Sequence, residues 1–224
     1  MAEYFITGTD TGVGKTWATL ALMASLQNKG EIVVGMKPVA SGCQNTSAGL
    51  RNDDAVRIIK QSNSQGDQTI KYKTVNPYAF EQAVAPHIAA YAAGAVIDIE
   101  KIAGEFNRLK KNADSVVVEG IGGWCVPLGD DTMLADLVNR LDLPVILIVG
   151  LRLGCINHAL STVRAIEADG ARLHGWITSQ LVPDYACLNE TMTTLQTCIA
   201  APFLGSLPYM DNFDVEIASG QLRI

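Results

Sequence analysis

The sequence contains no long hydrophobic segment. Its longest strongly apolar run, residues 143–151, has Pro144 inside it and is much shorter than the ~20 residues that a membrane-spanning helix needs. No apolar leader precedes the first short apolar run at residues 4–6, so the sequence predicts no secretory signal. We therefore expect a cytoplasmic protein without a membrane partner.

Paired cysteines and an excess of positive charge are also missing. The five cysteines are odd in number and form no C-x-x-C pair, which argues against a disulfide framework or a zinc site and favours reduced thiols. Lysine and arginine number 17 against 23 acidic residues, a net charge of −6. Nucleic-acid binding relies on clustered Lys and Arg, so we expect small-molecule partners and no nucleic acid.

No repeat, low-complexity tract or linker divides the chain, and we interpret residues 1–224 as a single domain with a full core. Apolar, strand-like runs alternate with helical patterns. The predicted strands are residues 4–6, 31–37, 113–119, 144–150, 175–180 and 203–209, with a further short strand at 69–74. This alternation predicts an α/β fold with a doubly wound, mostly parallel sheet.

Residues 8–16, Gly-Thr-Asp-Thr-Gly-Val-Gly-Lys-Thr, lie between a predicted strand and a predicted helix. This order predicts a phosphate-binding loop (P-loop), in which glycines let backbone N–H groups turn toward an anion and the helix start adds positive potential. Lys15 would reach the outer phosphates of a nucleoside triphosphate, and Thr16 would be a Mg²⁺ ligand. Five residues, where four are common, separate Gly8 from Gly14. The alternative is an ordinary glycine-rich strand-to-helix turn.

Charged residues occur at the ends or starts of three other predicted elements. Lys37 ends the second strand, at the edge where open α/β sheets bind ligands; the alternative is a solvated strand end. Asp54 lies in the first turn of a predicted helix, where an acidic residue is usually a cap or a dipole complement. Glu119 ends a β-branched strand and resembles the acidic residue that holds Mg²⁺ in nucleotidases; the alternative is a turn-facing glutamate.

A helix is predicted to begin near Gly154, with Asn157 as a plausible cap. A helix N-terminus can also bind a carboxylate. The segment therefore has two interpretations, a capped helix start or part of a substrate site.

Five motifs follow one another in a particular order. They are residues 8–16, residues 37–42 (Lys-Pro-Val-Ala-Ser-Gly), residues 49–54 (Gly-Leu-Arg-Asn-Asp-Asp), residues 118–124 (Val-Glu-Gly-Ile-Gly-Gly-Trp) and residues 154–158 (Gly-Cys-Ile-Asn-His). The series resembles the dethiobiotin synthetase family, ATP-dependent cyclo-ligases of biotin synthesis with a P-loop NTPase-like fold, over essentially the whole chain. The resemblance implies that 7,8-diaminopelargonate captures CO₂ as a carbamate, which attacks the γ-phosphate of ATP. The second amine then closes the ring on a carbamic–phosphoric anhydride, releasing ADP and phosphate.

The resemblance also implies roles for individual residues, in a homodimer. Lys37 and Lys15 would be catalytic, and Thr16, Asp54 and Glu119 would hold Mg²⁺. The diamine would be bound by Thr11, Lys37, Ser41 and, from the partner chain, Gly154, Cys155 and Asn157. ATP would be bound by Gly12, Val13, Gly14, Lys15, Thr16, Trp17, Asp54, Glu119, Gly120, Ile121, Gly122, Ser179, Gln180, Pro208, Tyr209 and Met210.

Three positions depart from the family pattern. Gly12 stands where some members have Glu, Ser179 where Asn often faces adenine, and Thr191 where Tyr often contacts the substrate carboxylate. Two rival functions stay open at this point. A partition-type or regulatory P-loop ATPase switch would account for the P-loop and Glu119, but not for the second and fifth motifs. A cobyrinate-type amidoligase would carry a glutaminase domain, which the sequence lacks.

Overall fold

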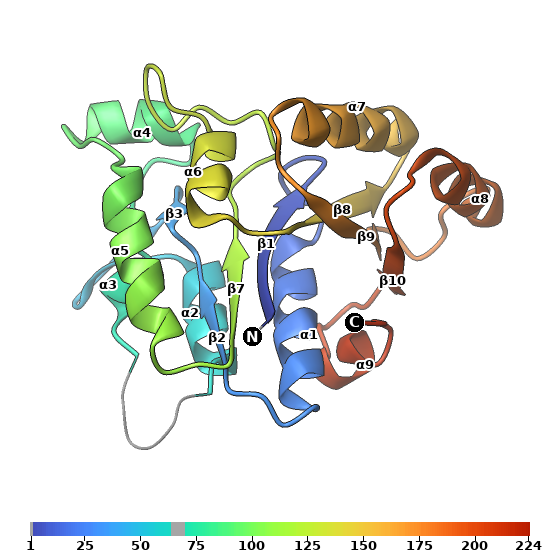
Figure 1. The fold of residues 1–224 in the computed structure, drawn as a ribbon, viewed down its shortest axis with the longest axis horizontal. Helices are drawn as coiled ribbons and strands as arrows, with labels where there is room; N and C mark the ends of the chain where they lie inside the picture. Colours follow the sequence, from blue (N-terminus) through green and yellow to red (C-terminus); the bar gives the residue numbers. More distant parts are fainter. Residues whose placement is uncertain (1, 64–69) are drawn as a thin grey trace.

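A central sheet of six parallel strands organises the computed structural model, which describes residues 2–63 and 70–224 (Figure 1). The strand order is β10-β9-β8-β1-β7-β2, and each neighbouring pair is parallel. The predicted α/β class and parallel sheet are therefore confirmed. The strands are β1 (Ala2–Gly8), β2 (Val33–Met36), β7 (Ser115–Glu119), β8 (Val145–Leu151), β9 (Leu173–Gln180) and β10 (Phe203–Leu207).

The central strands are apolar because both faces of the sheet are covered. Every residue of β2, β7 and β8 is buried, as expected for strands of a parallel sheet with helices on both sides. The register places Ile6 of β1 opposite Glu119 of β7, and Gly8 opposite Ile148 of β8. The P-loop and Glu119 therefore leave the sheet at the same edge.

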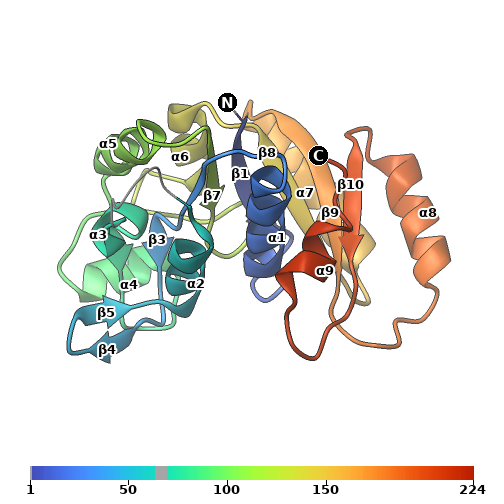
Figure 2. The same ribbon diagram turned by 90° about the horizontal axis from the view of Figure 1, so that it is seen from below.

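Successive residues of β8 point to opposite faces of the sheet and separate the two helical layers. Leu147, Val149 and Leu151 pack with α7 (Cys155–Ala168) and α8 (Leu188–Cys198). Ile146 and Ile148 instead join the cluster that contains α1 (Lys15–Gln27). Helix α1 lies between α2 (Asp53–Gln61) and α9 (Val215–Ser219), and α5 (Ile99–Lys110) and α6 (Leu134–Leu141) lie across the sheet from it (Figure 2).

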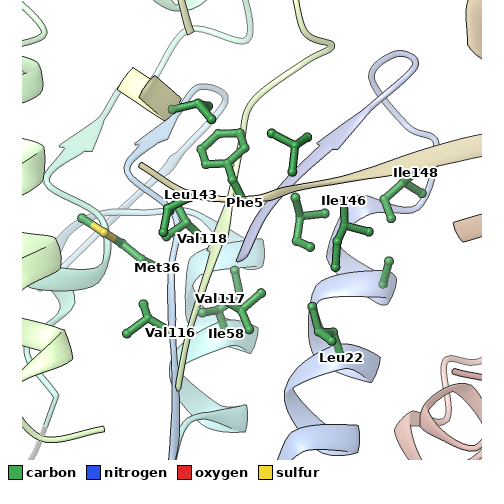
Figure 3. Close-up of a cluster of buried hydrophobic side chains, with 14 of the residues drawn as sticks. Phe5, Leu22, Met36, Ile58, Val116, Val117, Val118, Leu143, Ile146 and Ile148 are labelled. Carbon is green, nitrogen blue, oxygen red and sulfur yellow. The ribbon is translucent and has the colours of Figure 1, made fainter. Parts of the chain in front are cut away.

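The largest apolar cluster lies on either side of β1 and β7 (Figure 3). Phe5 of β1 and the valines of β7 occupy its centre, and Leu22 of α1 and Ile58 of α2 close one side. Burying such side chains contributes roughly 1.5–3 kcal/mol each. None of the helices in the described part of the chain has both the length and the hydrophobicity to cross a membrane.

Several short elements were not predicted. Strands β3 (Val39–Ala40) and β6 (Tyr78–Ala79) pair with each other, and β4 (Gln44–Thr46) and β5 (Gly49–Arg51) form an exposed hairpin. Helix α4 (Pro86–Ala92) follows β6 along the chain and begins with a proline, which suits the first turn of a helix.

The strand predicted at residues 69–74 is wrong where the chain is described, and residue 69 lies outside the described residues. Helix α3 (Tyr72–Val75) occupies this part instead. The Tyr72 hydroxyl accepts a hydrogen bond from the backbone of Asn52, 2.8 Å away, and donates one to Asn76, 2.9 Å away. These tertiary contacts fix a turn of helix that the local sequence pattern does not specify.

Gly205 of β10, which is packed closely against the C-terminal segment, gives a test of the fold. Gly205 has φ +143°, and a Cβ there would clash with the backbone carbonyl oxygen of Gln221. We expect Gly205→Ala to lower the free energy of unfolding by about 3 kcal/mol, since neither backbone segment can easily move aside. The measurement is the midpoint of urea unfolding, followed by circular dichroism.

The matched control is Gly104→Ala in α5, where a Cβ meets nothing within 4 Å. Alanine is the better helix former, so this variant should gain about 0.5–1 kcal/mol. Equal midpoints for the two variants would contradict the packing of β10 against the C-terminal segment.

Candidate active site

A cleft of about 1010 Å³ opens at the edge of the sheet where β1, β2, β7 and β9 end. The structure brings most of the predicted site residues together around this one cleft. Those that line it are Thr11, Gly12, Gly14, Lys15, Thr16, Trp17, Lys37, Ser41, Asp54, Glu119, Ile121, Gly122, Ser179, Gln180 and Tyr209. This position agrees with the rule that ligands of open α/β sheets bind outside the carboxyl ends of the strands.

The P-loop turns sharply into α1. Gly12 and Gly14 have φ of +74° and +89°, a conformation that favours glycine. Gly14 caps α1, so the first backbone N–H groups of the helix face the cleft and suit an anion. A Cβ on Gly14 would meet the Ser179 hydroxyl oxygen at 2.5 Å, so the loop and the end of β9 are packed directly on each other.

Lys15 points its ammonium group back into the site. Its Nζ donates to the backbone carbonyl oxygens of Asp10, at 2.7 Å, and Gly122, at 2.6 Å. Burial, followed by the positive charge of Lys37, lowers the pKa of Lys15 to about 8. The group is therefore mostly charged at neutral pH and loses its proton far more readily than an ordinary lysine.

Lys37 lies at the end of β2 in a buried ion pair. Its Nζ is 2.5 Å from Glu119 Oε1 and 3.4 Å from Asp54 Oδ2. Burial on its own would lower the pKa of Lys37, but the charges and hydrogen bonds of Glu119 and Asp54 outweigh it and the pKa is raised. Lys37 therefore holds its proton more firmly than Lys15 does, although both groups belong to the same cleft.

Glu119 has oxygen atoms to offer to a cation. Its Oε1 accepts from Lys37 and from the Thr16 hydroxyl, 3.0 Å away, whereas the buried Oε2 has no hydrogen-bond partner. No group of three or more His, Cys, Asp or Glu side chains suited to a metal occurs within residues 2–63 and 70–224. Two carboxylates and a hydroxyl are nevertheless the hard oxygen donors that Mg²⁺ takes alongside water and phosphate, so Thr16, Asp54 and Glu119 fit this ion.

The opposite end of the cleft is formed by β9 and the segment after β10. Ser179 is buried, and Gln180 donates its amide to the Pro183 carbonyl oxygen at 2.8 Å. Tyr209 donates its hydroxyl to Asp211 at 3.0 Å. Trp17 stacks on Phe213, with ring centroids 5.1 Å apart. Four predicted nucleotide-binding residues do not line this cleft: Val13, Gly120, Pro208 and Met210.

The start of α7 does not line the cleft of the same chain either. Gly154, with φ +91°, is the N-cap of the helix, so the cap predicted at Asn157 is wrong. Cys155 is buried with its Sγ 3.7 Å from the Tyr185 hydroxyl. Gly154, Cys155 and Asn157 thus do not line the cleft that Thr11, Lys37 and Ser41 share.

Sequence reasoning missed several residues of the site. Asn52, Asp53 and Arg57 of the α2 region line the cleft, as do residues 83–86 before and at the start of α4. Arg57 follows Asp54 by three positions, a spacing that puts both on one helix face, and this signal was available.

At this cleft the backbone amides of a helix start lie close to two lysines, two carboxylates and a hydroxyl. This combination defines a nucleoside-triphosphate-binding P-loop protein. A family model described as an AAA domain (AAA_26) matches residues 2–216. ATP-dependent dethiobiotin synthetase BioD of Xylella fastidiosa (strain Temecula1) is 44% identical over 94% of this chain and 91% of its own. The Xanthomonas oryzae pv. oryzae (strain PXO99A) protein of that name is 45% identical over 99% and 97%. The chain belongs to the dethiobiotin synthetase family.

Solved structures with the same fold are much more distant in sequence. The MinC:MinD cell division protein complex of Aquifex aeolicus matches with a TM-score of 0.57 at 20% identity, over 98% of this chain and 86% of that one. A ParA family ATPase from Chlorobium tepidum TLS matches with a TM-score of 0.57 at 10% identity, over 94% and 85%. At these identities the likeness shows the P-loop fold alone, and it lends no support to the partition-ATPase alternative.

The unusual environment of Lys15 gives a pH prediction. In ligand-free, metal-free protein, NMR of ¹³C-labelled lysine should show one side chain titrating near pH 8, because of burial and the Lys37 charge. A polyphosphate favours the protonated form, so its affinity should be greatest below pH 8. Above pH 8 the affinity for the polyphosphate should fall about tenfold per pH unit, until the pKa of Lys15 in the complex is reached.

A Lys15→Gln variant should lose the lysine signal that titrates near pH 8. A Lys15 titration at the ordinary 10.5 would contradict the described site.

Proposed function

We propose that this chain is an ATP-dependent dethiobiotin synthetase, a ligase of biotin biosynthesis that closes the ureido ring of dethiobiotin. Its substrates are 7,8-diaminopelargonate, CO₂ and ATP, and it releases ADP and phosphate. Family membership over nearly the whole chain supports the activity. The observation that supports the residue roles is the convergence of Lys15 and Lys37 on one cleft beside Glu119.

The proposed reaction transfers a phosphoryl group to a carbamate. One amine of the diamine captures CO₂, and a carbamate oxygen attacks the γ-phosphate of ATP. The second amine then attacks the carbamic carbon of the mixed anhydride, and phosphate leaves as the ring closes. Because such transfer depends on positioning and on charge stabilisation, Lys15 would neutralise charge on the transferring group and Lys37 would hold the carbamate against it.

Mg²⁺ would be held by Thr16, Asp54 and Glu119. When bound, the ion neutralises phosphate charge and orients the triphosphate. Support comes from the buried Glu119 Oε2, which has no hydrogen-bond partner, and from Asp54, whose side chain is 39% exposed to the cleft.

The two ends of the cleft would take different substrates. The phosphates of ATP would lie on residues 12–17, and its base would lie beyond them at Ser179, Gln180 and Tyr209. Pro208 and Met210, the neighbours of Tyr209 in the chain, would complete the base site. The diamine would lie at Thr11 and Ser41 on the other side of Lys15. Ser179 can donate and accept once but cannot form the two-point pairing that an amide makes with adenine.

We also propose a homodimer in which the start of α7 serves the site of the partner chain. Gly154, Cys155 and Asn157 do not line the cleft of their own chain, and a helix N-terminus suits the carboxylate of the diamine. Tyr185, beside Thr191 and Cys155, would supply the hydroxyl that the family usually has at position 191. The five cysteines are all free, which suits a reducing, cytoplasmic compartment.

Phosphate release from ATP tests the activity directly. With Mg²⁺ and bicarbonate present, release should depend on added 7,8-diaminopelargonate, and dethiobiotin should form in equal amount. ATP turnover that is indifferent to the diamine would instead indicate a switch ATPase and overturn the proposal.

Lys37→Gln tests the role of the buried lysine. The amide can still donate to Glu119 but carries no charge, so kcat should fall about 10²–10³-fold, the usual effect of losing one donor that stabilises the transition state. Lys73→Gln on the exposed face of α3 is the control and should retain full turnover. The same kcat for both variants would exclude Lys37 from the catalytic step.

Asn157→Ala tests the contribution of the partner chain. The KM for the diamine should rise about tenfold, since a hydrogen bond to a charged group is worth roughly 1.5–3 kcal/mol, while the KM for ATP stays within twofold. Asn189→Ala, in the exposed first turn of α8, is the control. Equal increases for both substrates would contradict the placement of α7 at the diamine.

A further inference from the structure

One short segment of backbone receives the ammonium groups of both catalytic lysines. Lys37 Nζ donates to the Gly120 carbonyl oxygen at 3.2 Å, and Lys15 Nζ donates to the Gly122 carbonyl oxygen at 2.6 Å. The segment, residues 120–123, follows Glu119 at the end of β7. Its position therefore helps to fix where both positive charges lie.

The segment has little stiffness of its own because three of its four residues are glycine. Its start is tied to β1, where the Gly120 amide donates to the Ile6 carbonyl oxygen at 2.9 Å. Near its end the Thr7 hydroxyl donates to the Gly123 carbonyl oxygen at the longer distance of 3.3 Å. This long hydrogen bond alone holds the Gly123 end of the segment only weakly.

Trp124 provides that anchor. The residue is 3% exposed, and its indole Nε1 donates to the Asp169 carboxylate at 2.7 Å. A hydrogen bond to an ionised acceptor is roughly twice as strong as one between neutral groups. Asp169 follows the last residue of α7, and its carbonyl oxygen accepts from Asn139 of α6 at 2.9 Å. The far end of the segment is thus tied to two helices.

We propose that Trp124 is a positioning residue for phosphoryl transfer, acting through residues 120–123 on Lys15 and Lys37. Its indole N–H, bonded to Asp169, keeps the Gly120 and Gly122 carbonyl groups in place, and these hold the two ammonium groups against the reacting phosphate. This inference rests on the proposed function. Trp124 itself does not line the cleft. Since a misplacement of about 1 Å can lower a rate 10²-fold, loss of the anchor should reduce kcat more than substrate binding.

The test compares two buried tryptophans that each donate one indole N–H, Trp124 to a carboxylate and Trp176 to a backbone carbonyl oxygen. Trp124→Phe removes one indole N–H and keeps an apolar ring. Trp176→Phe does the same in the cluster beneath α7 and α8, where Nε1 donates to the Ala201 carbonyl oxygen at 3.1 Å. We expect Trp124→Phe to lower kcat about tenfold with the KM for the diamine within twofold, and Trp176→Phe to stay within twofold of wild type in both.

Asp169 variants test the same bond from its acceptor side and do not disturb the core, because Asp169 is exposed. Asp169→Ala should match Trp124→Phe, and Asp169→Asn, which keeps an acceptor oxygen, should recover most of the rate. The double variant Trp124→Phe/Asp169→Ala should be no slower than either single variant. These variants keep the test decisive if Trp124→Phe fails to fold.

Two outcomes would overturn the role of Trp124. One is a double variant about 100-fold slower than wild type, the product of two independent effects; the other is equal kcat for Trp124→Phe and Trp176→Phe in assays below their unfolding temperatures. Either would leave the proposed function intact as long as wild-type phosphate release depends on the diamine. Failure of that dependence in wild type would refute the proposed function itself.

Discussion

The buried contact between Lys37 and Glu119 is the interaction on which the site depends. It joins the ends of β2 and β7, and the same carboxylate accepts from Thr16 at the start of α1. Such a pair adds little net stability, because desolvating two charges offsets their attraction, yet removing either partner leaves a costly buried charge. The pair therefore fixes the relative position of three elements rather than strengthening the fold.

The two lysines that face the cleft differ because their neighbours differ. Lys37 has carboxylates beside it, and its pKa is raised; Lys15 has only backbone carbonyl oxygens as partners, and burial lowers its pKa to about 8. The charges of Glu119, Asp54 and Asp10 offset this effect only in part, and a bound polyphosphate would add further negative charge beside Lys15. In the ligand-free protein, Lys15 is thus the lysine of the cleft that loses its proton more readily.

The parts of this fold that sequence predicts are those that hydrophobic burial dictates. The β-branched run of β7 and the apolar β8 could be placed within two residues, and a P-loop between strand and helix located the cleft. Hairpin β4–β5 and the two-residue pair β3–β6 were missed because exposed or very short strands leave no periodic pattern. Helix α9 had a readable signal in Asp214, whose side chain accepts from the amides of Glu216 and Ile217. Backbone partners such as the Gly122 carbonyl group have no sequence signature and needed the tertiary structure.

The close approach of Gly14 and Ser179 limits how this family member can change. Because a Cβ at position 14 would meet the Ser179 hydroxyl oxygen at 2.5 Å, the two positions share one small volume. A longer side chain at position 179 must turn away from the P-loop, and the space open to it is the part of the cleft beside β9. A larger residue at position 179 would therefore change the shape of this end of the cleft, and any Cβ at position 14 would have to displace the Ser179 hydroxyl.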